Sequence, residues 1–200
     1  MSNPIERSHQ DIEESEEPHR YTIPGGKEYE IRVAPSQQDF LKLCENLEDE
    51  EVELAARLAA RAALRPQEIR ELQEEDVMIE QQTIQLQIRS GDRIHYRTVP
   101  VQKYERLEEL LLKNGDESGK LISADINPTR EIRKTRGELE IPGDVQLHLQ
   151  GLRYTAIIDF FRRELPYCHI LTILGRNSTG KLLHLQEQVT EEISEKVKQE

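Results

Sequence analysis

The sequence is poor in aromatic residues and has no tryptophan. Phe, Trp and Tyr together make up only 4% of its 200 residues. Proteins that bind single-stranded nucleic acid stack bases on several exposed rings, so this composition argues against a stacking platform of that kind. The chain also has no apolar run long enough to span a bilayer, and the segment after Met1 soon becomes acidic, unlike the apolar core of a signal peptide. We therefore expect a cytoplasmic protein with no membrane partner.

Cysteine is scarce as well. Cys44 and Cys168 are far apart in the chain, and neither belongs to a CxxC motif or a histidine-rich segment. This spacing supports neither a disulfide framework nor a zinc site, so both residues are expected to be small packing residues. We expect no metal, no cofactor and no small-molecule substrate.

The chain as a whole has fewer basic than acidic residues, but one segment has more basic than acidic ones. The net charge is −12, which argues against a polyanionic partner because proteins that bind duplex DNA usually present clustered Lys and Arg. Residues 129–181, however, hold nine basic and six acidic residues, a net of +3. A basic face on this segment is therefore compatible with DNA binding.

The chain divides into three parts by composition. Prolines, glycines and an acidic run dominate residues 1–35, which we interpret as an acidic, largely disordered arm. Within it, Glu28 to Val33 alternates polar and apolar residues and is expected to dock as a short edge strand. A domain over residues 36–185 follows, and residues 186–200 form a charged C-terminal helix or tail.

Apolar spacing within the domain predicts a mainly α fold with a small antiparallel β-sheet. Pro66 suits the first position of a helix and excludes helical geometry at Arg65, which is thus expected at a junction between two helices. The expected helices lie near residues 36–47, 52–62, 107–112, 126–136, 152–165, 167–174 and 182–185. The expected strands lie near residues 76–79, 83–88 and 94–99.

Four short segments of this domain follow one another in a recognisable order. They are Ala63 to Ile69, Arg97 to Val101 at the end of a hairpin, Leu149 to Thr155, and Ile170 to Ser178. Together they resemble the motifs of the catalytic domain of tyrosine recombinases, also called phage integrases, over roughly residues 36–185. The resemblance implies that fold, double-stranded DNA as the partner, and a role in DNA recombination or integration.

The resemblance places Arg65 and Arg153 in the roles of the family's two phosphate-binding arginines. Two guanidinium groups suit such a site, because their forked donors match phosphate oxygens and stabilise developing charge. Arg153 is also expected in the first turn of a helix, where a bound anion would offset the unfavourable helix dipole. The alternatives are ordinary ion pairs: Arg153 with Asp159 or Glu68, and Arg65 with Glu68 or Glu71. Glu68 itself matches an acidic position that supports the site in the family.

The positions that handle protons in the family are changed here. Gln150 stands where the family has a histidine three residues before the second arginine, and Arg176 replaces the histidine of the Leu-Gly-His motif. The hairpin offers Arg89, Asp92 or Arg93 in place of a general-acid lysine, and arginine does not give up its proton near neutral pH. Protonation of the leaving group is therefore impaired.

The expected nucleophile is also missing. The family's tyrosine falls eight to ten residues after the Leu-Gly-His motif, where this chain has His184 and Leu185, and no tyrosine follows Tyr167. Without a phenolic oxygen the usual phosphotyrosine intermediate does not form. His184 is the remaining nucleophile in that window, although its apolar neighbours favour a structural histidine.

We therefore interpret the chain as a DNA-binding, recombinase-like protein that has lost strand cleavage, a regulator or accessory factor. An active recombinase with a replaced nucleophile, or one supplied by another subunit, and a protein-interaction module without DNA binding are the alternatives. A homo-oligomer formed through the C-terminal helix is a further expectation. The residues expected to contact DNA are Arg65, Arg93, Arg130, Arg133, Lys134, Arg136, Gln150, Arg153 and Arg176; the expected catalytic positions are Arg65, Arg153, Arg176 and His184.

Overall fold

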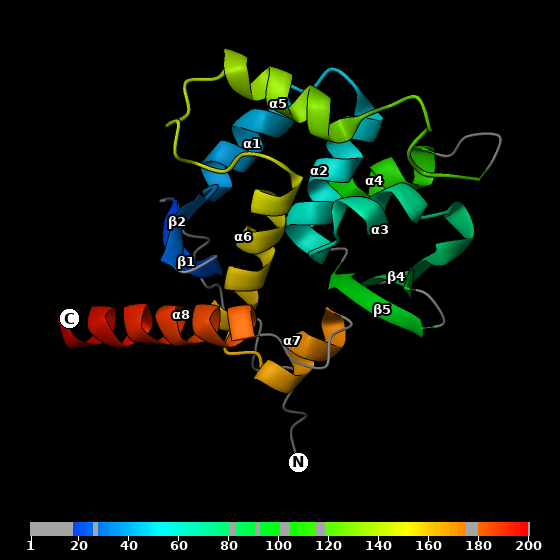
Figure 1. The fold of residues 1–200 in the computed structure, drawn as a ribbon. Coiled ribbons are helices and arrows are strands. Elements are labelled where there is room, and N and C mark those ends of the chain that lie inside the picture. The colour runs from blue at the N-terminus through cyan, green and yellow to red at the C-terminus, as the bar shows by residue number, and fades with distance from the viewer. Residues whose placement is uncertain are drawn as a thin grey trace.

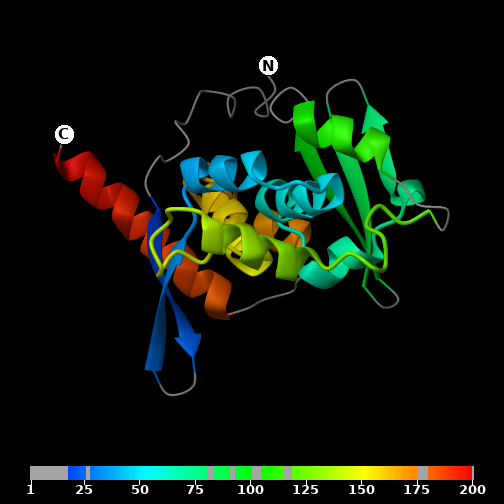
Figure 2. The same cartoon turned by 90° about the horizontal axis from the view of Figure 1, so that it is seen from above.

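Helices form the centre of the protein, and two small antiparallel sheets lie on opposite sides of them (Figures 1 and 2). The computed structural model describes residues 18–25, 28–80, 83–90, 93–100, 105–114, 119–174 and 180–199. The helices are α1 (Gln37–Glu45), α2 (Glu50–Ala62), α3 (Pro66–Glu71), α4 (Glu105–Lys113), α5 (Pro128–Glu138), α6 (Leu149–Arg162), α7 (Tyr167–Ile173) and α8 (Gly180–Gln199). The strands are β1 (His19–Gly25), β2 (Glu28–Ala34), β3 (Val77–Glu80), β4 (Thr83–Ser90) and β5 (Arg93–Pro100), and a short 3-10 helix, η2, spans Glu74–Asp76. The predicted fold class is confirmed.

Helices α2 and α6 pack closely against each other at the centre of the molecule. Helix α2 is rich in alanine, and Ala55, Ala56 and Ala59 are fully buried. Small side chains let two helix backbones approach, and the buried leucines of α2 fill the space beside them. This pair fixes the position of α6 relative to the loop that leaves α2.

The predicted hairpin is present as strands β3, β4 and β5. In β4, Ile84, Leu86 and Ile88 are buried and alternate with more exposed residues, as a sheet with one covered face requires. Strand β5 pairs with β4 so that Arg97 lies opposite Leu86. Arg97 is therefore on the covered face of the sheet.

The N-terminal segment is more ordered than the sequence suggested. Residues 19–34 form the hairpin β1–β2, which includes the expected strand from Glu28. Tyr21 and Ile23 of β1 are buried in an apolar cluster with residues of α6, α7 and α8. The prediction of a largely disordered arm is therefore wrong for residues 19–34. Contacts with the C-terminal half of the chain supply the apolar burial that the composition of this segment lacks. Residues 1–17 lie outside the described part of the chain.

Both edges of this hairpin are held by the rest of the protein. On β1, the backbone N–H of Thr22 donates to Gln188 Oε1 at 2.7 Å, and Gln188 Nε2 donates to the carbonyl oxygen of Thr22 at 2.8 Å. On β2, Val33 forms a parallel bridge with Val145, and the N–H of Gln146 donates to the Val33 carbonyl at 2.9 Å. The hairpin thus connects α8 to the segment that precedes α6.

Helix α8 also differs from the expectation of a short helix over residues 182–185 followed by a separate tail. It runs without a break from Gly180 to Gln199, since no proline or glycine interrupts the segment after Gly180. Leu182, Leu185 and Val189 are buried against the hairpin and α6. The structure therefore places residues 186–199 in the same helix as the end of the predicted domain.

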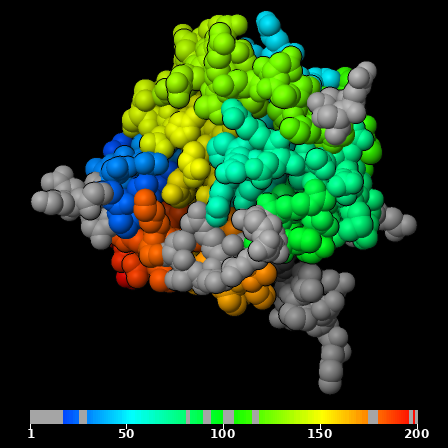
Figure 3. Space-filling model, turned by 45° about the vertical axis from the view of Figure 1, so that its right-hand side comes forward, coloured from blue at the N-terminus to red at the C-terminus, as the bar shows by residue number. Residues whose placement is uncertain are grey.

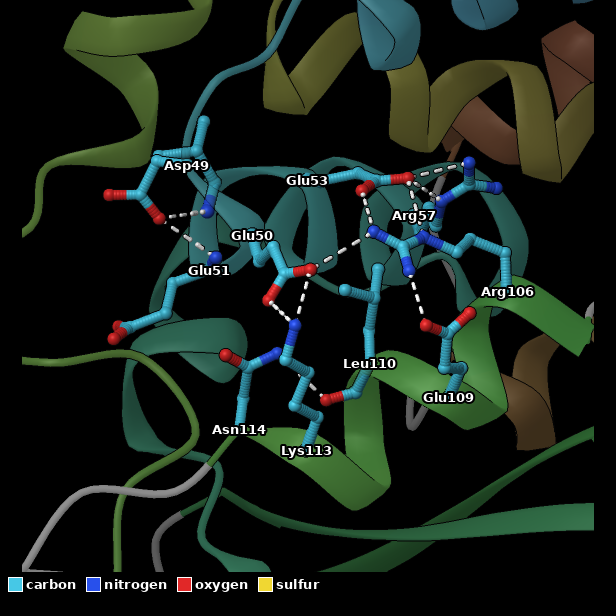
Figure 4. Close-up of polar contacts among 11 residues, drawn as sticks. Asp49, Glu50, Glu51, Glu53, Arg57, Arg106, Glu109, Leu110, Lys113 and Asn114 are labelled. Carbon is cyan, nitrogen blue, oxygen red and sulfur yellow. Dashed lines mark hydrogen bonds and ion pairs between the residues drawn. The ribbon is translucent and has the colours of Figure 1, made fainter.

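A network of ion pairs joins α2 to α4 (Figure 4). Arg106 of α4 contacts Glu53 Oε2 at 2.9 Å, Glu109 at 2.7 Å and Glu50 at 3.4 Å, and Arg57 contacts Glu53 at 2.7 Å. Burial raises the pKa of the Glu53 carboxyl, but hydrogen bonds from Arg106 and Arg57 outweigh that effect, and the net shift is downward. The network is thus centred on the Glu53 carboxylate, whose charge is stabilised by Arg106 and Arg57.

Replacing Arg106 with alanine is expected to destabilise the fold by about 1–2 kcal/mol, more than an exposed pair contributes, because Glu53 is buried and would keep only Arg57. Urea unfolding measures this loss. The matched control is Arg130→Ala, whose 82% exposed side chain is 3.9 Å from Glu131 and should change stability by less than about 0.5 kcal/mol. Equal effects of the two variants would contradict the central role of the network.

Candidate nucleic-acid interface

The loop between α2 and α3 presents Arg65. Ala63 ends α2 in the left-handed conformation (φ 53°), and Arg65 has an extended backbone directly before Pro66, as the sequence predicted. The backbone N–H of Arg65 donates to Glu68 Oε2 at 2.7 Å. Its side chain is 36% exposed, with Nε 3.8 Å from Glu68 Oε1. The backbone of Arg65 is therefore held at a fixed corner, and its side chain is partly exposed although Nε is buried.

Arg153 comes from α6 and reaches the same loop. Its Nε donates to the carbonyl oxygen of Ala63 at 2.9 Å, two residues before Arg65. The side chain is only 4% exposed. Arg153, 88 positions after Arg65 in the chain, thus contacts the loop that carries Arg65 between α2 and α3.

The helix dipole contributes less at Arg153 than the sequence suggested. Helix α6 begins at Leu149 rather than near Leu152, so Arg153 lies in its second turn. The dipole is strongest within the first turn. A predicted first-turn anion site at Arg153 is therefore wrong, and the case for this residue depends on its contact with the α2–α3 corner.

A third arginine of this region was missed by the sequence analysis. Arg97 of β5 is 1% exposed, and its Nη2 is 3.7 Å from Glu68 Oε1. Burial lowers its pKa to about 10, with the Glu68 carboxylate acting in the opposite direction and the charge of Arg65 in the same one. The available signal was the alternation of β5, which places Arg97 on the same covered face as Val99.

The start of α6 carries Gln150, which the sequence analysis predicted as a DNA contact, and His148, which it did not. Gln150 is half-buried. His148 is the N-cap, and its Nδ1 accepts the N–H of Gly151 at 3.1 Å, which requires an unprotonated Nδ1. Burial lowers the pKa of His148, and the charges of Arg32, Arg136 and Arg133 lower it further. The electrostatic surroundings of this helix start are therefore positive.

The basic helix α5 contains both surface and structural residues. Arg130, Arg133 and Lys134 are exposed. Arg136 instead donates from Nη2 to the carbonyl oxygens of Gly143 at 2.7 Å and Val145 at 3.0 Å, so it fastens the loop between α5 and α6. In the space-filling view, α5 lies above the surface where α3 adjoins the segment around the start of α6 (Figure 3).

His184 lies on α8 and faces the N-terminal hairpin. Its Nε2 is 3.0 Å from Thr22 Oγ1, and its Nδ1 is 3.7 Å from Glu187. These contacts favour the structural interpretation of this histidine over a nucleophilic one.

Of the remaining predicted positions, Arg89 is the one whose side chain belongs to the described part of the chain. Arg176 lies outside the described residues, as does Asp92, and for Arg93 only the backbone is described. Arg89 pairs with Asp76 at 2.8 Å and Glu75 at 3.0 Å. In the described part of the chain, no group of three or more His, Cys, Asp or Glu side chains could hold a metal ion. None of the described helices combines the length and apolar character that a membrane crossing needs.

Comparison with known proteins gives matches in structure but not in sequence. No protein-family model matches the chain, and no curated protein matches it. The XerA recombinase superimposes with a TM-score of 0.63 and 18% identity over 86% of this chain and 66% of that one. The XerH site-specific recombinase bound to difH gives 0.58 and 14% over 80% and 53%. The catalytic domain of bacteriophage HP1 integrase gives 0.52 and 20% over 79% and 84%.

These matches establish the fold. The chain has the fold of the catalytic domains of tyrosine recombinases and integrases, as the sequence motifs predicted. It spans about half the length of the XerH recombinase and covers 66% of XerA.

Proposed function

We propose that this protein binds double-stranded DNA through its sugar–phosphate backbone and holds it without cutting it. The observation that carries the proposal is the hydrogen bond from Arg153 to the Ala63 carbonyl, which brings Arg153 to the loop that presents Arg65. The similar structures support the choice of partner, since they include XerH bound to its difH substrate and lambda integrase bound to DNA.

The charges at this corner favour an anion. Arg65, Arg97 and Arg153 bring three guanidinium groups to the loop and its neighbouring strand, while Glu68 supplies one carboxylate in contact with two of them. The corner therefore has an excess of positive charge, and a phosphate oxygen can accept hydrogen bonds from the partly exposed guanidinium of Arg65. Helix α5 lies next to this surface in Figure 3, and its exposed cations can add sequence-independent contacts to the DNA backbone.

The loss of cleavage follows from the residues that remain. The window of the nucleophile holds His184, which is engaged with Thr22 and Glu187, and Gln150 and Arg176 do not transfer protons near neutral pH. Such a site stabilises a bound phosphodiester but lacks the group that would attack it. We therefore place the protein among regulators or accessory factors of DNA transactions in the cytoplasm.

A titration of the full chain with a fluorescent DNA duplex at two salt concentrations tests the proposal. Phosphate contacts make affinity fall steeply as salt rises. Arg65→Ala is expected to weaken binding about tenfold and to lower the salt slope by about one, the signature of one lost phosphate contact. The control is Arg20→Ala on the hairpin, a 67% exposed arginine paired with Asp144 at 3.4 Å, which should leave binding unchanged.

Two outcomes would replace the proposal with its alternatives. A covalent adduct trapped on a nicked suicide duplex would identify an active recombinase with another nucleophile. Wild-type protein that shows no salt-dependent binding would favour a protein-interaction module.

We also retain homo-oligomerisation through the C-terminal helix as a proposal, although Val189 of that helix is buried within its own chain. Size-exclusion chromatography with and without residues 187–200 tests it, and an unchanged monomer would end it.

A further inference from the structure

The position of Arg97 is energetically unfavourable for a charged side chain. It is 1% exposed, and among the described residues none of its three guanidinium nitrogens has a hydrogen-bond partner. Burial of an ionised group without hydrogen bonds is strongly unfavourable, and an apolar side chain of similar length would avoid the penalty. A charge in this place therefore needs an explanation beyond packing.

The carboxylate of Glu68 connects Arg97 to Arg65. Glu68 Oε2 accepts the backbone N–H of Arg65, which fixes the direction of the carboxylate. Its other oxygen, Oε1, lies between the two guanidinium groups, 3.8 Å from Arg65 Nε and 3.7 Å from Arg97 Nη2. At these distances the oxygen attracts both cations without a hydrogen bond to either. Arg65 Nε is itself without a hydrogen-bond partner in the described structure.

The two cations differ in access. Arg97 is enclosed beneath the sheet, whereas Arg65 is 36% exposed. An incoming phosphate can therefore meet Arg65 but not Arg97. Because Arg97 also attracts the Glu68 carboxylate, Glu68 holds the Arg65 guanidinium less strongly than it would alone. The Arg65 guanidinium therefore remains able to bind an anion.

We propose that Arg97 is a positioning residue of the phosphate site, which acts through Glu68 to set the orientation and availability of the Arg65 guanidinium. The proposal rests on the proposed function, in which Arg65 holds a DNA phosphate. When Arg65 engages the phosphate, Arg97 becomes the principal partner of Glu68 Oε1, so this partly buried carboxylate is never left unpaired. Arg97 itself makes no contact with DNA.

Duplex titrations with four variants test this proposal: Arg97→Met, Arg97→Lys, Arg65→Ala and the double variant Arg65→Ala/Arg97→Met. Arg97→Met should weaken binding five- to tenfold and lower the salt slope by about one, as Arg65→Ala does, because the effective contact of Arg65 is lost. The double variant should bind no more weakly than Arg65→Ala, since Arg97 acts only through Arg65. Arg97→Lys keeps the charge and should recover most of the affinity.

A structural role alone would give another pattern. The proposal would be overturned if Arg97→Met lost stability in urea, the double variant showed additive losses of affinity, and Arg97→Lys recovered no affinity. It would also be overturned if Arg97→Met bound DNA with wild-type affinity. We expect the methionine variant to fold, because Arg97 makes no hydrogen bond in the described structure and Glu68 keeps its contacts with Arg65.

A measurement without DNA separates this proposal from the proposed function. The NMR signal of the Arg65 Nε–H should shift and broaden in Arg97→Met and return toward its wild-type position in Arg97→Lys. If the wild type binds no DNA, the proposed function fails, and an Arg65 signal that still responds to Arg97 preserves the positioning role. An unchanged signal overturns that role whether or not DNA binds.

Discussion

Gly151→Ala is expected to destabilise the protein by at least about 3 kcal/mol. A Cβ atom at this position would lie 1.7 Å from the carbonyl oxygen of Gln146 and 2.8 Å from its carbonyl carbon. These are backbone atoms, and they are not free to move, because the N–H of Gln146 is bonded to Val33 of β2 and its carbonyl accepts the N–H of His148. The start of α6 would have to shift away from the hairpin.

Thermal unfolding measures the effect, which corresponds to a fall in melting temperature of roughly 6–12 °C for a chain of this size. Gly137→Ala is the matched control, since it lies in α5 and a Cβ there meets nothing within 4 Å. Alanine favours a helix over glycine, so the control should be neutral or more stable by up to about 1 kcal/mol. Wild-type stability of the Gly151 variant would show that the approach of the two backbones is not as close as described.

Arg153→Met should weaken both folding and DNA binding. The variant keeps the apolar stem of a side chain that is 4% exposed but removes the donor to the Ala63 carbonyl, which is buried at a left-handed residue. The loss of a hydrogen bond from a charged donor is expected to cost about 2 kcal/mol in unfolding free energy. Arg65→Ala, at a more exposed side chain, should cost less than about 0.5 kcal/mol.

The two arginines are therefore distinguishable by paired measurements. Urea unfolding gives the stability of each variant, and duplex titration at a temperature where both are folded gives its affinity. Both should lose about tenfold in affinity or more, whereas only Arg153→Met should lose stability. An Arg153→Met protein with wild-type stability would contradict the structural half of its role, and one with wild-type affinity would contradict its part in holding the loop that presents Arg65 to DNA.

Local sequence patterns predicted most of the central domain. Pro66 fixed the start of α3 and the extended backbone of Arg65, and strict alternation indicated β4 and the covered face that Ile84 and Leu86 share. Strand β1 was missed because its burial comes from elsewhere. Tyr21 and Ile23 pack against α8, more than 150 residues later, and no local window contains that information.

The candidate site was only partly predictable. Arg65 and Arg153 were identified through the family resemblance, and their DNA-binding and catalytic roles stay predictions. The sequence did not indicate that Arg153 is buried and bonded to the loop that carries Arg65, since burial depends on how α2 and α6 pack. Arg97 carried a usable signal in its strand alternation, but a charged residue on a covered face is rare and was not expected.

The hairpin at the N-terminal side has a consequence for behaviour in concentrated solution. A two-stranded ribbon ordinarily offers unsatisfied amide and carbonyl groups along both margins, on which strands of other molecules can assemble. Here the carboxamide of Gln188 supplies Thr22 with one acceptor and one donor, as a neighbouring strand would, and the N–H of Gln146 supplies a donor to the carbonyl of Val33 beside its bridge to Val145. These positions are satisfied within the molecule, which protects the ribbon there against aggregation by strand addition.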